Sequence, residues 1–128
     1  MILDTSAIVA LLLAESSSVR ILDILEKSVS TGVGTPTLTE TGVVLAHRVG
    51  SGWEKALDDF LDDYKVEAIP FDRLHWREAV TAYRRFGKGW HPARLNFGDC
   101  MSYAVARLAG RPLLCTGRDF ARTDLDLA

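Results

Sequence analysis

The first fourteen residues, MILDTSAIVALLLA (1–14), contain the pattern that decides the fold. Residues 1–4, with their apolar pair at positions 2 and 3, read as a short buried strand, and the apolar run that ends this stretch reads as a core helix. Asp4 lies between them, where the strand ends. Aspartate, serine and threonine are all preferred helix N-caps, and we expect Thr5 or Ser6 to cap this helix. Asp4 is therefore open to a capping interpretation and to a functional one.

The rest of the chain repeats the alternation of strand and helix patterns. Further short strands are expected within residues 33–37, 66–71 and 111–116. Because strands alternate with helices, the sequence favours parallel pairing in a layered α/β arrangement, and 128 residues fit one compact domain. The helices expected between the strands cover residues 16–28, 38–50, 53–64, 74–87 and 99–110, with a loop over 87–98.

Composition excludes several classes of protein. A net charge of -2 gives no global attraction for nucleic acid, so any such binding must depend on a local patch. Cys100 and Cys115 form neither a Cys-x-x-Cys pair nor a zinc-ligand spacing, and we expect two reduced, buried thiols. The apolar run near the start is too short to span a bilayer and follows an acid rather than basic residues. We expect a cytoplasmic protein with no membrane segment.

Four acids lie near strand ends or helix starts, although they are far apart along the chain. Sites in open parallel sheets form at the carboxyl ends of the strands, so these side chains are expected to share one edge. Grouped carboxylates resist ionising together unless a positive charge lies among them, and Mg²⁺ and Mn²⁺ favour such oxygen ligands. A metal held there can cleave a phosphodiester bond. An acid in such a position, taken singly, is more often a helix cap or a solvated charge, so the argument depends on the coincidence of several; the four acids are Asp4, Glu40, Asp99 and Asp119.

The stretch YRRFGKGWHPAR (83–94) is rich in basic and aromatic side chains and contains no acid. Such a mixture suits single-stranded RNA, and we expect Lys88, His91 and Arg94 to contact it. The alternative is a solvated helix end followed by an unspecific basic loop. The acidic run within 54–63 has helical spacing and is expected to be solvated helix surface.

Four stretches in this order resemble PIN-domain ribonucleases, and more narrowly the VapC toxins of bacterial toxin–antitoxin pairs. They are LDTSA (3–7), TLTE (37–40), NFGDCMSYAVAR (96–107) and LLCTGRDFARTDL (113–125). The resemblance implies a single PIN domain over residues 1–128, with three layers and a central, mostly parallel sheet of about four to five strands flanked by helices.

The resemblance also implies an activity and partners. It implies a Mg²⁺- or Mn²⁺-dependent endoribonuclease that hydrolyses RNA through metal-activated water and leaves a 5′-phosphate and a 3′-hydroxyl. It further implies a cognate VapB-like antitoxin that blocks the cleft, and a homodimer. The acids that match the first three positions of the family site are Asp4, Glu40 and Asp99, of which Asp4 and Asp99 would hold the metal most directly.

The fourth acid of the site departs from the pattern of many PIN domains. Gly117 occupies the position of that acid, so Asp119 is the expected substitute and Asp124 a weaker one. The departure leaves open whether the site holds one metal ion or two. It also leaves open an alternative function, that of a catalytically weak PIN-fold module that binds RNA or a partner. Three hydroxyl side chains would orient water or a carboxylate, or serve only as caps and strand-end hydrogen bonds; these are Thr5, Ser6 and Thr116.

Overall fold

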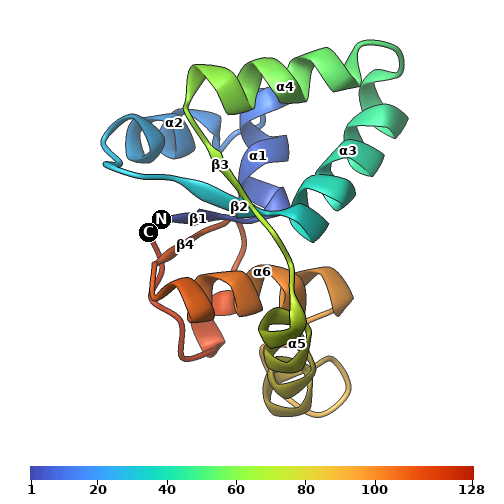
Figure 1. Cartoon of the computed structure of the whole chain (residues 1–128), viewed down its shortest axis with the longest axis vertical. Coiled ribbons are helices and arrows are strands. Elements are labelled where there is room, and N and C mark those ends of the chain that lie inside the picture. Colours follow the sequence, from blue (N-terminus) through green and yellow to red (C-terminus); the bar gives the residue numbers. More distant parts are fainter.

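The computed structural model describes residues 1–128 and shows one sheet between two groups of helices (Figure 1). Four strands form the sheet in the order β3-β2-β1-β4, and every neighbouring pair is parallel. The expected α/β class and parallel pairing are therefore confirmed. The strands are β1 (Ile2–Leu3), β2 (Gly32–Gly34), β3 (Glu67–Ile69) and β4 (Leu113–Leu114).

Helices connect each strand to the next and cover both faces of the sheet. In Figure 1, α1 to α4 lie on one face, and α5 and α6 lie on the other. None of the helices combines the length and the apolar character that crossing a bilayer requires. The helices are α1 (Thr5–Leu12), α2 (Ser18–Glu26), α3 (Thr35–Val49), α4 (Trp53–Asp63), α5 (Arg73–Phe86) and α6 (Phe97–Ala109), with a short 3₁₀ helix η1 (Phe120–Arg122) near the end.

Each face of the sheet carries its own apolar core, because successive strand residues point to opposite faces. Ile2 and Leu113 pack into the cluster beneath α5 and α6, whereas Leu3 and Leu114 pack into the cluster beneath α1 to α4. All four side chains are almost completely buried. This two-sided burial explains why the central strands are continuous apolar pairs, and it gives the domain its three layers.

The strand order creates a switch point at the carboxyl ends of β1 and β4. The chain runs from β1 to β2 to β3 in one direction and then returns through α5 and α6 to place β4 on the other side of β1. The backbone N–H of Asp4 donates to the carbonyl of Leu114 at this edge (3.0 Å). Open α/β sheets place ligands in the crevice at such a point, which here lies beside Asp4.

The cap of α1 differs from the sequence-based expectation. Thr5 and Ser6 already lie within the helix, and Asp4 is the cap, since its Oδ2 accepts the backbone N–H of Ser6 (3.0 Å). The expectation was wrong because three successive residues are all good caps, and local preference does not choose among them. Asp4 therefore caps α1 and also ends the strand.

Two other helices begin two or three residues earlier than the patterns predict. The helix expected from residue 38 begins at Thr35. Pro36 is tolerated there, because an N–H in the first turn has no partner within the helix and its absence costs no hydrogen bond. The helix expected from Asp99 begins at Phe97, after an N-cap at Asn96. Asp99 is consequently the third residue of α6, where its side chain reaches back to the cap.

Candidate active site: a carboxylate cleft at the sheet edge

An open cleft of about 310 Å³ lies at the carboxyl ends of β1 and β4. It brings together three of the four acids singled out in the sequence, although they come from three separate parts of the chain. It also includes Glu15, which sequence reasoning missed because the residue follows a helix end rather than a strand. The lining residues are Asp4, Thr5, Ser6, Val9, Glu15, Glu40, Val44, Asp99 and Thr116.

Two hydrogen bonds from Ser6 hold the Asp4 carboxylate in the cleft. Only 5% of the residue is exposed, and its Oδ2 accepts both the backbone N–H and the hydroxyl of Ser6 (3.0 and 2.5 Å). The Ser6 Oγ in turn accepts the backbone N–H of Thr116, which follows β4 (3.0 Å). Ser6 thus joins the ends of β1 and β4 through Asp4, a second role besides lining the cleft.

Glu40 approaches the cleft from α3 and is exposed. The hydroxyl of Thr5 donates to its Oε2 (2.6 Å), so the first turn of α1 fixes one carboxylate oxygen. The other carboxylate oxygen lies against the first turn of α6 at Gly98. Glu40 therefore bridges the helices that begin beside Asp4 and beside Asp99.

Asp99 reports the charge gathered around the cleft. Its pKa is raised to about 6. Burial is the largest cause, the carboxylates of Asp4, Asp119 and Glu40 also raise the pKa, and a hydrogen bond from the Asn96 backbone opposes the rise. Asp119 is exposed and lies outside the cleft lining, yet its charge reaches Asp99. The other three acids singled out in the sequence consequently all act electrostatically on Asp99.

The donor set has the chemistry that a hard divalent cation requires. No lysine, arginine or histidine lines the cleft, so no side chain there neutralises the carboxylates. No three His, Cys, Asp or Glu side chains lie close enough to chelate one ion together. Mg²⁺ commonly takes one or two carboxylates and keeps several waters, so this spacing suits it better than a closed cage.

A model of the PIN domain matches residues 1–125. This chain belongs to the PIN-domain family. Its relatives include ribonuclease VapC42 of Mycobacterium tuberculosis strain H37Rv, 40% identical over 126 residues, with 98% of this chain and 96% of the relative covered. They also include a ribonuclease VapC of Mycolicibacterium smegmatis, 39% identical over 129 residues and covering 98% and 97% of the two chains. The resemblance to VapC proteins seen in the four stretches is thereby confirmed.

Solved structures match this PIN domain in fold along almost its whole length. The crystal structure of Mycobacterium tuberculosis VapC20, described as a sarcin–ricin loop cleaving toxin, matches with a TM-score of 0.81 at 20% identity, covering 99% of this chain and 97% of that one. VapBC2 from Rickettsia felis, solved with a promoter DNA fragment, matches with a TM-score of 0.78 at 18% identity, covering 99% and 96%. At these identities the matches establish the fold alone.

The fourth acid position of this PIN domain falls in a turn with a left-handed glycine. Gly117 has a φ of 82°, a left-handed conformation that disfavours an aspartate or glutamate there. Asp119, two residues later, is the acid whose charge reaches Asp99. Asp124 is engaged elsewhere, since its carboxylate accepts the Tyr103 hydroxyl (2.5 Å) and an Arg85 N–H (2.9 Å). Asp124 therefore ties the end of the chain to α5 and α6 rather than lining the cleft.

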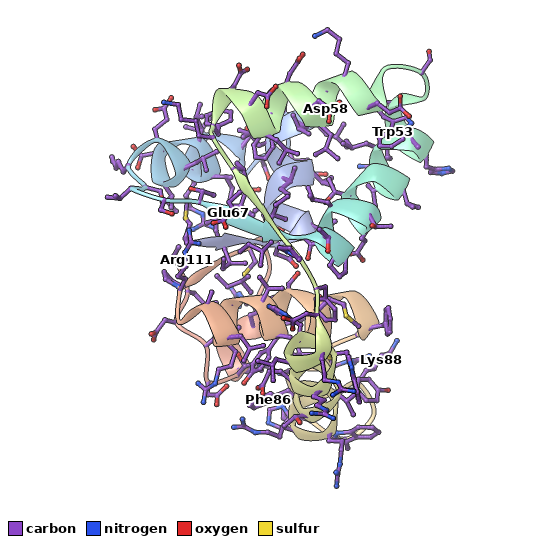
Figure 2. All side chains as sticks on the ribbon, viewed as in Figure 1. Trp53, Asp58, Glu67, Phe86, Lys88 and Arg111 are labelled. Atoms are coloured by element: carbon purple, nitrogen blue, oxygen red, sulfur yellow. The ribbon has the colours of Figure 1, made fainter.

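The basic residues expected to contact RNA lie together on the loop between α5 and α6, outside the cleft. Lys88, His91 and Arg94 line an open hollow of about 530 Å³ beside Trp90, which is 59% exposed. The side chains of Lys88 and Arg94 form no hydrogen bond or ion pair, whereas the His91 Nδ1 accepts the N–H of Ala93. Figure 2 shows Lys88 on the opposite side of the sheet from the exposed acids of α4, represented by Asp58.

A hollow of about 800 Å³, larger than the carboxylate cleft, lies elsewhere on the molecule. It is an apolar groove lined chiefly by α5 and α6, and it contains no acid. A smaller hollow of about 370 Å³ shares Pro36, Phe97 and Met101 with it and includes Glu40. The apolar groove therefore adjoins the cleft but has the character of a contact surface rather than a reaction site.

The charge on Asp99 should be measurable as a cost to the stability of the metal-free protein. A carboxyl whose pKa is higher in the folded protein than in the unfolded chain loses stability as the pH rises through the folded value. Replacement by asparagine keeps an acceptor for the Asn96 N–H and removes the charge. We therefore expect Asp99→Asn to raise the melting temperature in EDTA at pH 7.5, above the pKa of about 6.

The gain should vanish well below pH 3.8, the ordinary pKa of an aspartate, because only there is Asp99 protonated in both the folded and the unfolded state. Thermal melts at the two pH values test this. A gain of equal size at both pH values, or a lower melting temperature at pH 7.5, would contradict the electrostatic interpretation of the cleft.

Proposed function

We propose that this PIN domain is a Mg²⁺- or Mn²⁺-dependent endoribonuclease and the toxin of a toxin–antitoxin pair. The observation that carries the proposal is the convergence of Asp4, Glu40 and Asp99 on a cleft without a basic side chain, at the switch point of the sheet. The charge of Asp119, outside the cleft lining, also reaches Asp99. The names of relatives about 40% identical to this chain, VapC ribonucleases, support RNA as the substrate.

In this proposal the acids of the cleft hold a cation, and the neighbouring hydroxyl groups orient the acids. Asp4 and Asp99 are the direct ligands in this proposal, with Glu40 and Asp119 reached through water. A divalent cation supplies, when bound, activation of water and stabilisation of charge on the phosphate. Ser6 keeps Asp4 in one orientation by two hydrogen bonds, and the Thr5 hydroxyl does the same for Glu40.

Cleavage of RNA by the purified protein tests the proposed reaction. Structured RNA incubated with protein and Mg²⁺ or Mn²⁺ should be cut to products with a 5′-phosphate and a 3′-hydroxyl, and EDTA should stop the cutting. RNA binding without cleavage under any metal would favour the alternative, a PIN-fold binding module. Cleavage that persists in EDTA would exclude the metal-dependent reaction.

We propose that the loop cations bind phosphates of the RNA. Lys88 and Arg94 are free of protein partners and lie, with His91, beside an exposed tryptophan, the mixture that binds single strands. The double charge reversal Lys88→Glu/Arg94→Glu is expected to weaken RNA binding and to reduce the slope of log K against log salt by roughly 1.4, since each single-strand phosphate contact contributes about 0.7.

Fluorescence anisotropy in EDTA over a series of salt concentrations measures both quantities. Lys65→Glu is a matched control, because Lys65 is an exposed, unpaired cation at a positive φ of 51°, comparable with 55° at Arg94, but lies between α4 and β3. If the slope were unchanged in the double variant, or if Lys65→Glu changed RNA binding equally, the loop would not be part of the RNA-binding surface.

The proposal includes two protein partners. The structural matches to a VapBC2 assembly and to a toxin–antitoxin complex from Klebsiella pneumoniae support an antitoxin partner, and we propose that this partner blocks the cleft. The exposed apolar side chains of Trp76, Val80 and Phe97 around the groove of α5 and α6 support a homodimer. A monomeric mass measured by light scattering would contradict the homodimer. If the protein encoded by a neighbouring gene left RNA cleavage unchanged, that protein would not be the antitoxin.

A further inference from the structure

The first turn of α6 lies unusually close to the carboxylate of Glu40. A Cβ atom built on Gly98 would come within 2.6 Å of Glu40 Oε1 and within 2.9 Å of both Cδ and Oε2. Real Cβ atoms essentially never approach another heavy atom so closely. The space that any side chain at position 98 would need is therefore occupied by one carboxylate of the cleft.

The backbone gives no other reason for a glycine at this position. Gly98 is absent from the residues with a positive φ and lies in the first turn of an ordinary helix. Alanine stabilises a helix better than glycine, so the sequence carries a weaker helix former where the helix itself would accept a stronger one. Glu40 supplies a steric reason, since its three carboxylate atoms are the nearest heavy atoms to that Cβ.

The two helices that carry these residues cannot easily move apart. Thr37 of α3 and Ser102 of α6 share a hydroxyl–hydroxyl hydrogen bond of 3.1 Å, and both side chains are fully buried. A methyl group at position 98 must consequently be accommodated by the exposed, flexible Glu40 side chain. That movement would also stretch the hydrogen bond from the Thr5 hydroxyl to Glu40 Oε2.

We infer that Gly98 is a positioning residue that, together with the Thr5 hydroxyl, holds the Glu40 carboxylate in the cleft. The inference rests on the proposed function for its effect on RNA cleavage. The contact itself is a statement about packing that holds whatever the reaction. Gly98 leaves room for the carboxylate on one side, and Thr5 fixes it by a hydrogen bond on the other. Neither residue needs to touch RNA.

The test is a double-mutant cycle of Gly98→Ala and Glu40→Ala. With Glu40 present, Gly98→Ala is expected to lower kcat for RNA cleavage at least tenfold while KM changes less than threefold, and to weaken Mn²⁺ binding measured without RNA. In the Glu40→Ala background the same substitution should change kcat and Mn²⁺ affinity by less than twofold. A tenfold loss in both backgrounds would overturn the inference, because Gly98 would then act on Asp99 or on the helix directly.

Thermal melts in EDTA make the contact testable independently of RNA cleavage. Gly98→Ala should raise the melting temperature more in the Glu40→Ala background than with Glu40 present, because only there is the helix gain free of the clash. Equal increments would overturn the inference even if the protein cleaves RNA. Failure of the wild-type protein to cleave RNA would overturn the proposed function, while unequal increments would still establish the Gly98–Glu40 contact.

Discussion

RNA cleavage should fall at least about 100-fold when either Asp4 or Asp99 is replaced by asparagine, since removing a residue that merely supports a metal ligand already costs about 10- to 100-fold. Asparagine preserves the size of each side chain and an acceptor for the local hydrogen bonds from Ser6 or Asn96. The loss would therefore be attributable to the missing negative charge. The rate should be measured under saturating Mg²⁺, with RNA binding measured separately.

Asp124→Asn is the matched control for this prediction. It makes the same chemical change on an acid that pairs with Tyr103 and Arg85 and does not line the cleft. We expect it to lower thermal stability, because it weakens a contact between the chain end and α5, but to keep cleavage below its melting temperature. Asp4 and Asp99 variants that cut RNA as fast as this control would show that the cleft is not the reaction site.

The second large effect concerns the core that delivers the acids to the edge. Leu114 is completely buried in β4, next to β1, and packs into the cluster beneath α1 to α4. Leu114→Ala is expected to lower the free energy of unfolding by about 2–5 kcal/mol, through lost apolar burial and the cavity that remains. Urea denaturation of the metal-free protein measures this change, and the slope of the unfolding free energy against urea concentration should be the same in both proteins.

Leu74→Ala serves as the comparison, because Leu74 is 61% exposed on α5. A substitution at such a site should stay within about 0.5 kcal/mol of the wild-type value. Similar losses at the two positions would mean that β4 is not a central strand of the core. In that case the geometry that joins Asp4 to the residues after β4 would lose its support.

The sequence predicted the sheet edge because the relevant signal is local. Ile2 is buried on one face of the sheet and Leu3 on the other. An acid that directly follows such a buried strand lies at the carboxyl edge of the sheet. Asp4 could be placed there from four residues of sequence. Helix starts were less predictable, because Pro36 and Phe97 lie in stretches that also read as turn or loop, and the choice depends on capping.

Contacts between distant residues were beyond the sequence pattern. Nothing local indicates that Gly98 lies against Glu40, 58 positions earlier, because the approach depends on how α3 and α6 cross. Glu15 likewise reaches the cleft only through the turn after α1. For Asp124, the surrounding residues suit an active-site or a structural role equally well, and the hydrogen bond from Tyr103 places it in the structural role.

The cation-binding capacity of the cleft is the central claim, and Mn²⁺ titration followed by electron paramagnetic resonance tests it most directly. The account predicts saturable Mn²⁺ binding by the wild-type protein and by Asp124→Asn, strongly weakened binding by Asp4→Asn and Asp99→Asn, and competition by Mg²⁺. Mn²⁺ affinity that is the same in all four proteins would contradict the account, because the ion would then bind somewhere other than the carboxylate cleft.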